Sequence, residues 1–372
     1  MRDWPDFSGT LYEEAVARVL RSGCYTEGPE TAALERQAAG MFGVDPGRVV
    51  AVSSGTAALE LILRASHWLR PGGAILMPAV TFTATAQAVE AAGYRAVLCD
   101  VDPERWTLCP ADAKRRMNSQ TVGILSVDLD GAKPDVAGLL ELNLPIVSDA
   151  CASWGWCHDR SFPMASSAYS LNQTKIAGCG EGGLVVAESC LVADEIRALR
   201  CFGEERPAAL RRRADIPGGG NRKMTEMTAA MAQVSLSLLR SRIERARTNQ
   251  GILWLGLQDQ ELIAAPAAAA ETALHKFRAR IRTNRKEAEF ALAGLKVPCQ
   301  HREVSPLYAH PGLACYGEGL GFPNAARFLR ETVVLGSRGQ PLWHADPMDV
   351  GRWSQAMRRF DDKVTSKEVR NV

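Results

Sequence analysis

The chain has 372 residues, enough for one large domain and a smaller one with an ample core. Its 44 Lys and Arg nearly balance 42 Asp and Glu, so the formal charge of +2 implies no nucleic acid or other polyanionic partner. No apolar run approaches the roughly 18 residues of a membrane-spanning helix, and the N-terminus lacks a signal-like apolar core. We therefore expect a cytoplasmic protein with no membrane contact.

The ten cysteines form no C-x-x-C pair, and the six histidines are dispersed. This pattern predicts neither a metal site nor a disulfide framework, and the cysteines are typical of small core residues in a reducing compartment. Cys151 and Cys179 fall near the candidate site described below, where packing is the simpler interpretation and a catalytic role the alternative.

The first half of the chain alternates helical and strand patterns. Residues 10–22 and 29–42 are predicted helices, and a buried strand at 49–52 precedes a helix from Thr56 to Leu69. Further short apolar strands follow in AILM, RAVLCDVD, VGILSVD and PIVSDA. Short apolar strands alternating with helices indicate an α/β fold whose mostly parallel sheet is covered on both faces.

The stretch SAYSLNQTKIAGCGEGGLVV, residues 167–186, predicts a strand, a polar turn carrying Lys175, and a second strand. A lysine between buried strands and beside glycines is a candidate Schiff-base nucleophile, because desolvation and nearby charge can lower its pKa. The alternative is a solvated turn lysine, which is the commoner state of this residue type.

Three features favour the first interpretation. Asp149 ends the run PIVSDA, at the carboxyl end of a strand where ligands of α/β sheets collect. The segment Ser53 to Ala57, which contains Gly55 and Thr56, joins a strand to a helix, and exposed amides at a helix start bind anions. Ser170 adds a hydroxyl five residues before Lys175. A lysine, an acid and a phosphate cup are the parts that bind pyridoxal phosphate.

Gly178, Gly180 and Gly183 match G-x-G-x-x-G literally. A dinucleotide-binding motif must follow a strand and open a helix, whereas these glycines lead into the strand LVVA. We therefore reject a nucleotide-binding interpretation.

The second half begins with a polar segment from Glu204 to Gly220 that includes Arg211, Arg212 and Arg213. We interpret the arginines as a solvated face, with attraction of an anionic substrate such as a nucleotide diphosphate as the alternative. The next run, to Gln250, predicts one long helix capped by Thr225. The strand pattern ALHKFRARI and the helix-to-strand pattern FPNAARFLRETVVLG then indicate a smaller α+β domain.

Several motifs, taken together and in this order, resemble the DegT/DnrJ/EryC1/StrS family of sugar aminotransferases, within the aspartate-aminotransferase superfamily. They are GPETAALERQAAGMFGV, AVSSGTAALELILRA, PAVTFTATAQAVEAAGYRAVLCDVDP, SDACASWG, SLNQTKIAGCGEGGLVV and GGGNRKMTEM. The resemblance covers about Trp4 to Phe360. It implies fold type I, with an N-terminal segment (1–28), a large cofactor-binding domain (29–245) and a small C-terminal domain (246–372) that closes over the substrate.

The resemblance also implies roles for single residues. Lys175 would hold pyridoxal phosphate as an imine and move protons, and Asp149 would keep the pyridine nitrogen protonated. Phe82 would stack on the cofactor ring, although a first-turn phenylalanine is more often core. Asn221 would cross to the phosphate of the neighbouring subunit, which implies a homodimer. The full expected cofactor-binding set is Gly55, Thr56, Ala57, Phe82, Asp149, Ala152, Ser170, Lys175 and Asn221.

Three positions depart from the usual family pattern. Ala152 stands where Gln, His or Glu is common, so a cofactor contact is missing there. Asp128-Leu129-Asp130-Gly131 replaces an H-L-Y-G-like motif, and Lys223 stands at an arginine position and cannot grip a carboxylate bidentately. His275 and His301 are of interest only because the family's C-terminal domain is similar around them.

We therefore expect an aminotransferase that converts a keto group of a sugar, nucleotide sugar or cyclitol to an amine, with glutamate or glutamine as donor. One alternative keeps the cofactor but acts on a non-sugar substrate or with altered chemistry, although Lys175 argues against the family's dehydratases, which replace that lysine. Another alternative is a non-catalytic cofactor-binding sensor or partner protein.

Overall fold

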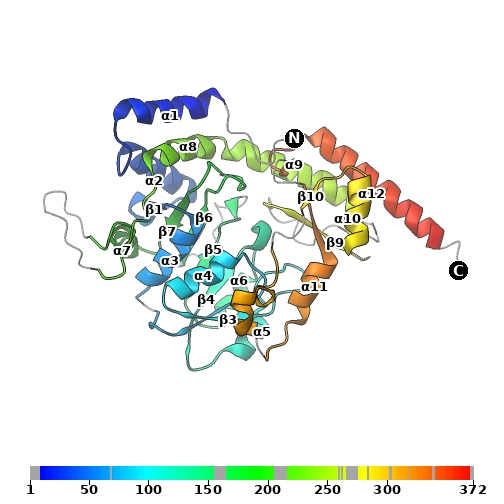
Figure 1. Cartoon of the computed structure of the whole chain (residues 1–372), viewed down its shortest axis with the longest axis horizontal. Helices are drawn as coiled ribbons and strands as arrows, with labels where there is room; N and C mark the ends of the chain where they lie inside the picture. The colour runs from blue at the N-terminus through cyan, green and yellow to red at the C-terminus, as the bar shows by residue number, and fades with distance from the viewer. Residues whose placement is uncertain are drawn as a thin grey trace.

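The computed structural model contains two β-sheets (Figure 1). One sheet has seven strands and the other four among the residues that the structure describes. Those residues are 9–67, 69–154, 165–204, 216–258, 260, 263–264, 275–282, 285–300, 304–317, 319–336 and 340–368. Arg211, Arg212, Arg213 and His301, which the sequence analysis singled out, lie outside them.

The larger sheet has the strand order β1-β7-β6-β5-β4-β2-β3. Every neighbouring pair is parallel except β1 with β7 and β6 with β7, so β7 alone runs against the others. This confirms the predicted mostly parallel sheet. Its strands are β1 (Val49–Val52), β2 (Ala74–Pro78), β3 (Arg95–Cys99), β4 (Thr121–Val127), β5 (Ile146–Asp149), β6 (Ser166–Ser170) and β7 (Gly183–Val186).

Helices cover both faces of this sheet. Successive side chains of β1 point alternately to the two faces and pack against different helices. Val50 and Val52 pack with the helices of one face, whereas Val49 and Ala51 pack with those of the other. The first face carries α3 (Gly55–Ala65), α4 (Thr83–Ala91) and α7 (Cys190–Arg200). The second carries α2 (Pro29–Phe42), α5 (Pro110–Arg116), α6 (Val136–Leu140) and α8 (Glu226–Ser237).

The predicted N-terminal helices are confirmed as α1 (Thr10–Ser22) and α2, and α1 lies against α8. Gly23 ends α1 in the left-handed conformation, with φ of 68°. The helix expected to run from Thr56 to Leu69 instead ends at Ala65, because the Ser66 hydroxyl bonds back to the Ile62 carbonyl at 2.6 Å and the chain leaves the helix there.

The single long helix predicted before Gln250 is wrong. The structure has two consecutive helices, α8 and α9 (Leu239–Leu257), with Leu238 between them. Ser237 and Ser241 donate their hydroxyls to the carbonyls of Val234 and Leu238, three residues back, which competes with the helical ladder at this point. The predicted cap is confirmed, since Thr225 accepts a hydrogen bond from the Thr228 amide.

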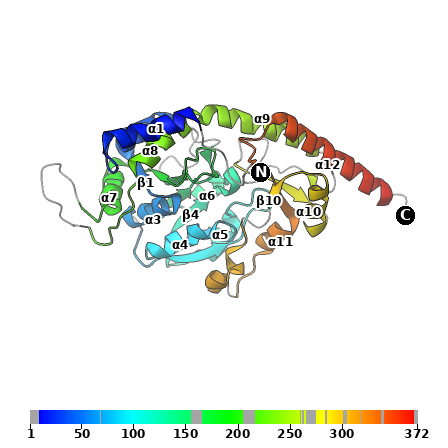
Figure 2. The ribbon, with the colours of Figure 1, turned by 45° about the horizontal axis from the view of Figure 1, so that its top comes forward.

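The four-stranded sheet is antiparallel with the order β10-β11-β9-β8. The predicted strand in ALHKFRARI and the predicted helix running into a strand are both confirmed. Helices α9 and α12 pack side by side, and both join the apolar cluster that β9 and β11 form (Figure 2). The elements are β8 (Ile263–Ala264), β9 (Phe277–Ile281), α10 (Arg285–Gly294), β10 (Cys299–Gln300), α11 (Pro323–Glu331), β11 (Thr332–Leu335) and α12 (Pro347–Glu368).

The segment from Leu307 to Phe328 joins the core of the large sheet. Leu307, Leu313 and Phe328 belong to the same apolar cluster as α3 and α4. The Asp100 carboxylate, just after β3, accepts hydrogen bonds from the first amides of α11 at 3.0 and 2.8 Å. The smaller sheet is therefore fixed to the larger one by apolar packing and by a helix cap.

A buried ion pair adds a third attachment. Arg278 of β9 donates to Asp130, which follows β4, at 2.6 Å, and both side chains are 9% exposed. The guanidinium also lies over the Phe328 ring, 4.5 Å from its centroid. Asp130 has a φ of 56°, in the left-handed region that aspartate tolerates.

Replacing Arg278 with methionine should lower the free energy of unfolding by about 3 to 5 kcal/mol, because it leaves the Asp130 carboxylate buried without its cation. Chemical denaturation followed by circular dichroism measures this loss. The double variant Asp130→Asn with Arg278→Met should recover part of it, since no charge then remains buried. Equal destabilisation of the single and the double variant would contradict the role of the ion pair.

Candidate active site

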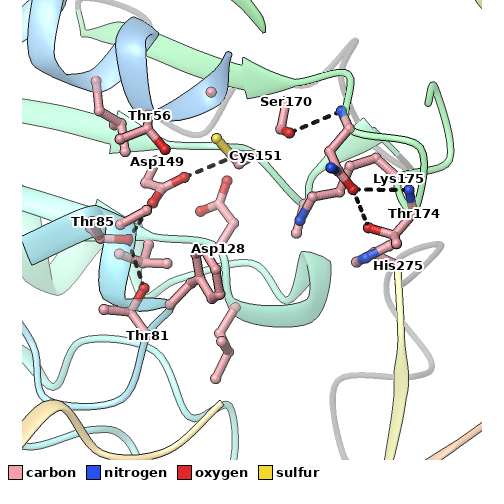
Figure 3. Close-up of a pocket in the computed structure, with 18 of the residues that line it drawn as sticks. Thr56, Thr81, Thr85, Asp128, Asp149, Cys151, Ser170, Thr174, Lys175 and His275 are labelled. Carbon is pink, nitrogen blue, oxygen red and sulfur yellow. Dashed lines mark hydrogen bonds between the residues drawn. The ribbon is translucent and has the colours of Figure 1, made fainter. Parts of the chain in front are cut away.

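A cavity of about 460 Å³ lies beside the carboxyl ends of β4, β5 and β6 (Figure 3). Most of the lining belongs to the part of the chain that forms the larger sheet. His275, Lys276 and Val304, from the part that forms the smaller sheet, complete it. Seven of the expected cofactor-binding residues meet there: Gly55, Thr56, Phe82, Asp149, Ala152, Ser170 and Lys175. Ala57 and Asn221 are not among the lining residues.

Asp149 ends β5 and is held from two sides. Its Oδ2 accepts a hydrogen bond from the Thr85 hydroxyl at 2.8 Å, and its Oδ1 accepts one from the Cys151 amide at 3.2 Å. Thr85 in turn pairs with Thr81 at 3.0 Å. The side chain is 6% exposed. These contacts fix the carboxylate toward the cavity, and sequence reasoning missed Thr85.

Lys175 lies on the turn between β6 and β7, as predicted. Asn172 organises this turn, because its Oδ1 accepts from both the amide and the hydroxyl of Thr174, and its amide nitrogen donates to Glu181. The Lys175 amide donates to the Asn172 carbonyl at 2.8 Å. The lysine is half-buried and lines the cavity, which excludes the freely solvated alternative.

The start of α3 forms the candidate phosphate site. Ser54 caps the helix by accepting the Ala57 amide at 3.1 Å, so the amides of Gly55 and Thr56 remain first-turn donors with no partner inside the helix. The Ala57 amide is already bonded to the Ser54 hydroxyl, so it is not free to donate to a phosphate. A Cβ on Gly55 would stand 2.8 Å from Cys151 Sγ and 3.0 Å from Ser170 Cβ, so only glycine lets Ser170 approach this closely.

The close approach of the two strands that border this site also depends on glycine. A Cβ on Gly183, the first residue of β7, would lie 2.3 Å from the Ser54 carbonyl oxygen. Gly183 therefore lets the strand pass directly beside the start of α3. This confirms that the glycines of the literal G-x-G-x-x-G lead into a strand and do not open a helix.

Phe82 is the residue before α4 and is 62% exposed while lining the cavity. Its exposure excludes the alternative that it is a core residue. Stacking on the cofactor ring stays a prediction.

Asn221 lies on the surface, where its backbone forms a bridge with Cys201. It is not part of the cavity of its own chain. Lys223 is turned to the Phe202 ring, with its amine 4.2 Å from the ring centroid, and is likewise not among the lining residues.

Two buried polar side chains of the cavity were not among the expected cofactor-binding residues. Asp128 is 1% exposed, and its Oδ1 has no hydrogen-bond partner among the described residues. His275 is 4% exposed, and neither ring nitrogen is paired within the described part of the chain. Burial, with the Lys175 charge adding to it, holds the pKa of His275 well below its usual value, so the imidazole is neutral.

The two cysteines near the site are thiols. Burial raises the pKa of Cys151 well above its usual value, with the neighbouring Asp149 charge adding to the effect. Burial likewise raises the pKa of Cys179 to about 12. A protonated thiol is a poor nucleophile, so packing explains these residues better than catalysis. No group of three or more candidate metal ligands occurs among the described residues.

The donor set fits pyridoxal phosphate. One cavity brings together an amine on Lys175, a carboxylate on Asp149, free amides at the start of a helix, and the Ser170 hydroxyl. A seven-stranded, mostly parallel sheet carries all of them at one edge. This fold and site define a pyridoxal-phosphate-dependent enzyme of fold type I.

Comparison with known proteins agrees with this class. The profile of the DegT/DnrJ/EryC1/StrS aminotransferase family matches residues 9–341. The chain is 30% identical over 365 residues to dTDP-3-amino-3,4,6-trideoxy-alpha-D-glucose transaminase of Streptomyces venezuelae, covering 95% of this chain and 92% of that protein. It is 29% identical over 284 residues to L-glutamine:2-deoxy-scyllo-inosose aminotransferase of Micromonospora echinospora. That match covers 70% of this chain and 67% of that protein.

The structure also superposes on that of S. venezuelae DesV in complex with a ketimine intermediate. The TM-score is 0.84 at 28% identity, covering 94% of both chains. The chain therefore belongs to the DegT/DnrJ/EryC1/StrS aminotransferase family. It is an aminotransferase, and its cofactor is pyridoxal phosphate. No helix among the described residues has the length and apolar character to cross a bilayer.

Proposed function

We propose that the protein transfers an amino group from glutamate or glutamine to the keto group of a sugar, a nucleotide-linked sugar or a cyclitol. The observation that carries this proposal is the meeting of Lys175, Asp149 and the start of α3 in one cavity. The relatives support the acceptor class, because their names specify a dTDP-linked amino sugar and a scyllo-inosose. We place the activity in the cytoplasm, in specialised-metabolite or surface-glycan biosynthesis.

Lys175 is the proposed catalytic residue. Its amine would hold the cofactor covalently, and its Nζ would then carry a proton from the α-carbon of the donor to the cofactor carbon that had borne the aldehyde. Bound pyridoxal phosphate supplies an electron-accepting ring. The Asn172-organised turn holds the lysine backbone so that Nζ faces the cavity.

Asp149 is the proposed partner of the cofactor's ring nitrogen. A carboxylate at that nitrogen keeps it protonated, and the Thr85 hydroxyl and Cys151 amide fix the direction in which the charge points. The amides of Gly55 and Thr56, with the Ser170 hydroxyl, would bind the phosphate.

The absorption spectrum of the purified protein with pyridoxal phosphate tests this function, as glutamate, glutamine and other donors are added singly. We expect one of the first two donors to discharge the covalently bound cofactor to its amine form and to release a 2-oxo acid detectable by mass spectrometry. The loaded protein is then offered a dTDP-4-keto sugar and scyllo-inosose. A cofactor that no donor discharges would contradict the proposed transfer.

We further propose a homodimer in which Asn221 reaches the phosphate of the neighbouring subunit. Its surface position outside its own cavity supports this. Replacing Asn221 with alanine should raise the dissociation constant for pyridoxal phosphate about tenfold, the effect of losing one hydrogen bond to a charged group. Equilibrium dialysis measures it, with the exposed Asn118→Ala as control.

Mixed dimers separate this role from one within the same subunit. A dimer of one Lys175→Ala chain and one Asn221→Ala chain contains one intact site if Asn221 acts across the interface. It contains none if Asn221 serves its own subunit. We therefore expect one of the two sites of the mixed dimer to bind pyridoxal phosphate with wild-type affinity. Weakened binding at both sites would contradict the proposal.

A further inference from the structure

Asp128 follows β4 directly, next to the strand that ends in Asp149. The two strands are in parallel register, with Val127 opposite Asp149, and the Asp128 amide donates to the Asp149 carbonyl at 3.1 Å. The side chain lines the cavity and is 1% exposed. A buried carboxyl oxygen without a partner is costly, so its position facing a ligand cavity needs an explanation.

The surroundings of Asp128 favour the neutral acid. Burial raises the pKa of its carboxyl well above the usual value, and the Asp149 charge adds to this, while Ser153 and Lys133 act in the other direction. The other titratable residues that line the cavity are Asp130, Cys151, Lys175, Glu181, His275 and Lys276. Two neighbouring buried carboxyls do not both ionise readily, and Asp149 is the one that accepts two hydrogen bonds, from Thr85 and from the Cys151 amide.

The contacts of Asp128 leave one oxygen available. The Ser153 hydroxyl donates to Oδ2, so Oδ1, which has no hydrogen-bond partner among the described residues, is the oxygen that would carry the acid proton. Figure 3 shows the carboxyl pointing into the cavity between Asp149 and Lys175. In pyridoxal phosphate the ring hydroxyl oxygen is attached next to the carbon that bears the aldehyde, on the path from that carbon toward the ring nitrogen.

We propose that Asp128 donates a hydrogen bond from Oδ1 to the ring oxygen of bound pyridoxal phosphate. It is thereby a positioning residue that controls how tightly the Lys175 nitrogen, once linked to the cofactor, holds its proton. This rests on the proposed function, in which Asp149 meets the ring nitrogen and Lys175 the aldehyde carbon. A donor at the ring oxygen stabilises negative charge there. The oxygen then holds the proton of the linked lysine nitrogen less tightly, so the pKa of that nitrogen falls.

The test is a pH titration of the visible absorption of the protein loaded with pyridoxal phosphate, without substrate. Replacing Asp128 with valine should raise the spectroscopic pKa of the linked nitrogen by one to two pH units, the size expected for loss of a hydrogen bond to a charged oxygen. Asp128→Asn keeps a donor of the same shape and should stay within about half a unit of wild type.

The sign of the shift decides between the acid and its ionised form. An ionised Asp128 would stabilise the protonated nitrogen, so both substitutions would then lower the spectroscopic pKa, and this result would overturn the proposal. An unchanged pKa in Asp128→Val would overturn it too. Absence of any covalent cofactor band in the wild-type protein would instead overturn the proposed function.

A second measurement covers the case in which Asp128→Val does not fold. The infrared difference spectrum of wild type against Asp128→Asn at neutral pH should show the carbonyl stretch of one protonated carboxyl in the wild type only. Absence of that band would show that Asp128 is ionised and would overturn the proposal.

Discussion

Replacing Lys175 with alanine should abolish the covalent attachment of pyridoxal phosphate and lower the rate of amino transfer by about 10⁴-fold, the upper range for a positioned general base. The physical reason is that the proposed function gives Lys175 two roles at one atom, since Nζ would both link the cofactor and carry the proton. The remaining contacts, from Asp149 and the start of α3, should still bind the cofactor without a covalent bond. Borohydride reduction followed by peptide mass spectrometry measures the attachment.

Lys276 provides a matched control, because it is a second lysine that lines the cavity. Lys276→Ala should leave the reducible attachment on the peptide that contains residue 175. A reducible attachment in Lys175→Ala, or its loss in Lys276→Ala alone, would show that the link has been assigned to the wrong lysine.

Replacing Asp149 with asparagine should lower kcat by about 10³-fold, the loss that accompanies removal of a preorganised electrostatic partner. The amide has nearly the same shape and can occupy the same place beside Thr85 and the Cys151 amide. It carries no charge, however, so it cannot keep the cofactor's ring nitrogen protonated. The lysine attachment should persist, which separates this variant from Lys175→Ala.

The variant Thr85→Val tests how much the orientation of the Asp149 carboxylate contributes to the rate. It leaves the Asp149 carboxylate in place but removes the hydroxyl that orients it, so kcat should fall only about tenfold. Asp45→Asn, an exposed aspartate at the short helical turn Pro46–Arg48, controls for the change of residue type. A full rate in Asp149→Asn would mean that another group protonates the ring.

The sequence was enough to predict the parts of the site that lie close together along the chain. The turn that bears Lys175, the helix start at Gly55 and the acid at the end of PIVSDA each follow from a local pattern. Because parallel strands present their carboxyl ends at one edge, these separate patterns were expected to meet. The resemblance to the family added Phe82 and Asn221, which no local pattern could assign to a cofactor.

Contacts between distant segments could not be predicted in this way. Thr85 reaches Asp149 across 64 positions, and Arg278 reaches Asp130 across 148. No periodicity in the sequence specifies such a pair, since burial and facing orientation arise only from packing. Asp128 was noticed as a departure from the family pattern, but only its burial beside Asp149 shows that it belongs to the site.

The attachments of the smaller sheet have a consequence for how the acceptor enters. Swinging that sheet away from the larger one as a rigid body would expose Phe328, uncap α11 and separate the Asp130–Arg278 pair in one step. Each of these losses removes a stabilising interaction, so opening a hinge between the two sheets is an energetically unfavourable way to admit the acceptor. We therefore expect acceptors to be selected by their fit to the cavity that this packing leaves, without the closure of the small domain that the family resemblance implies.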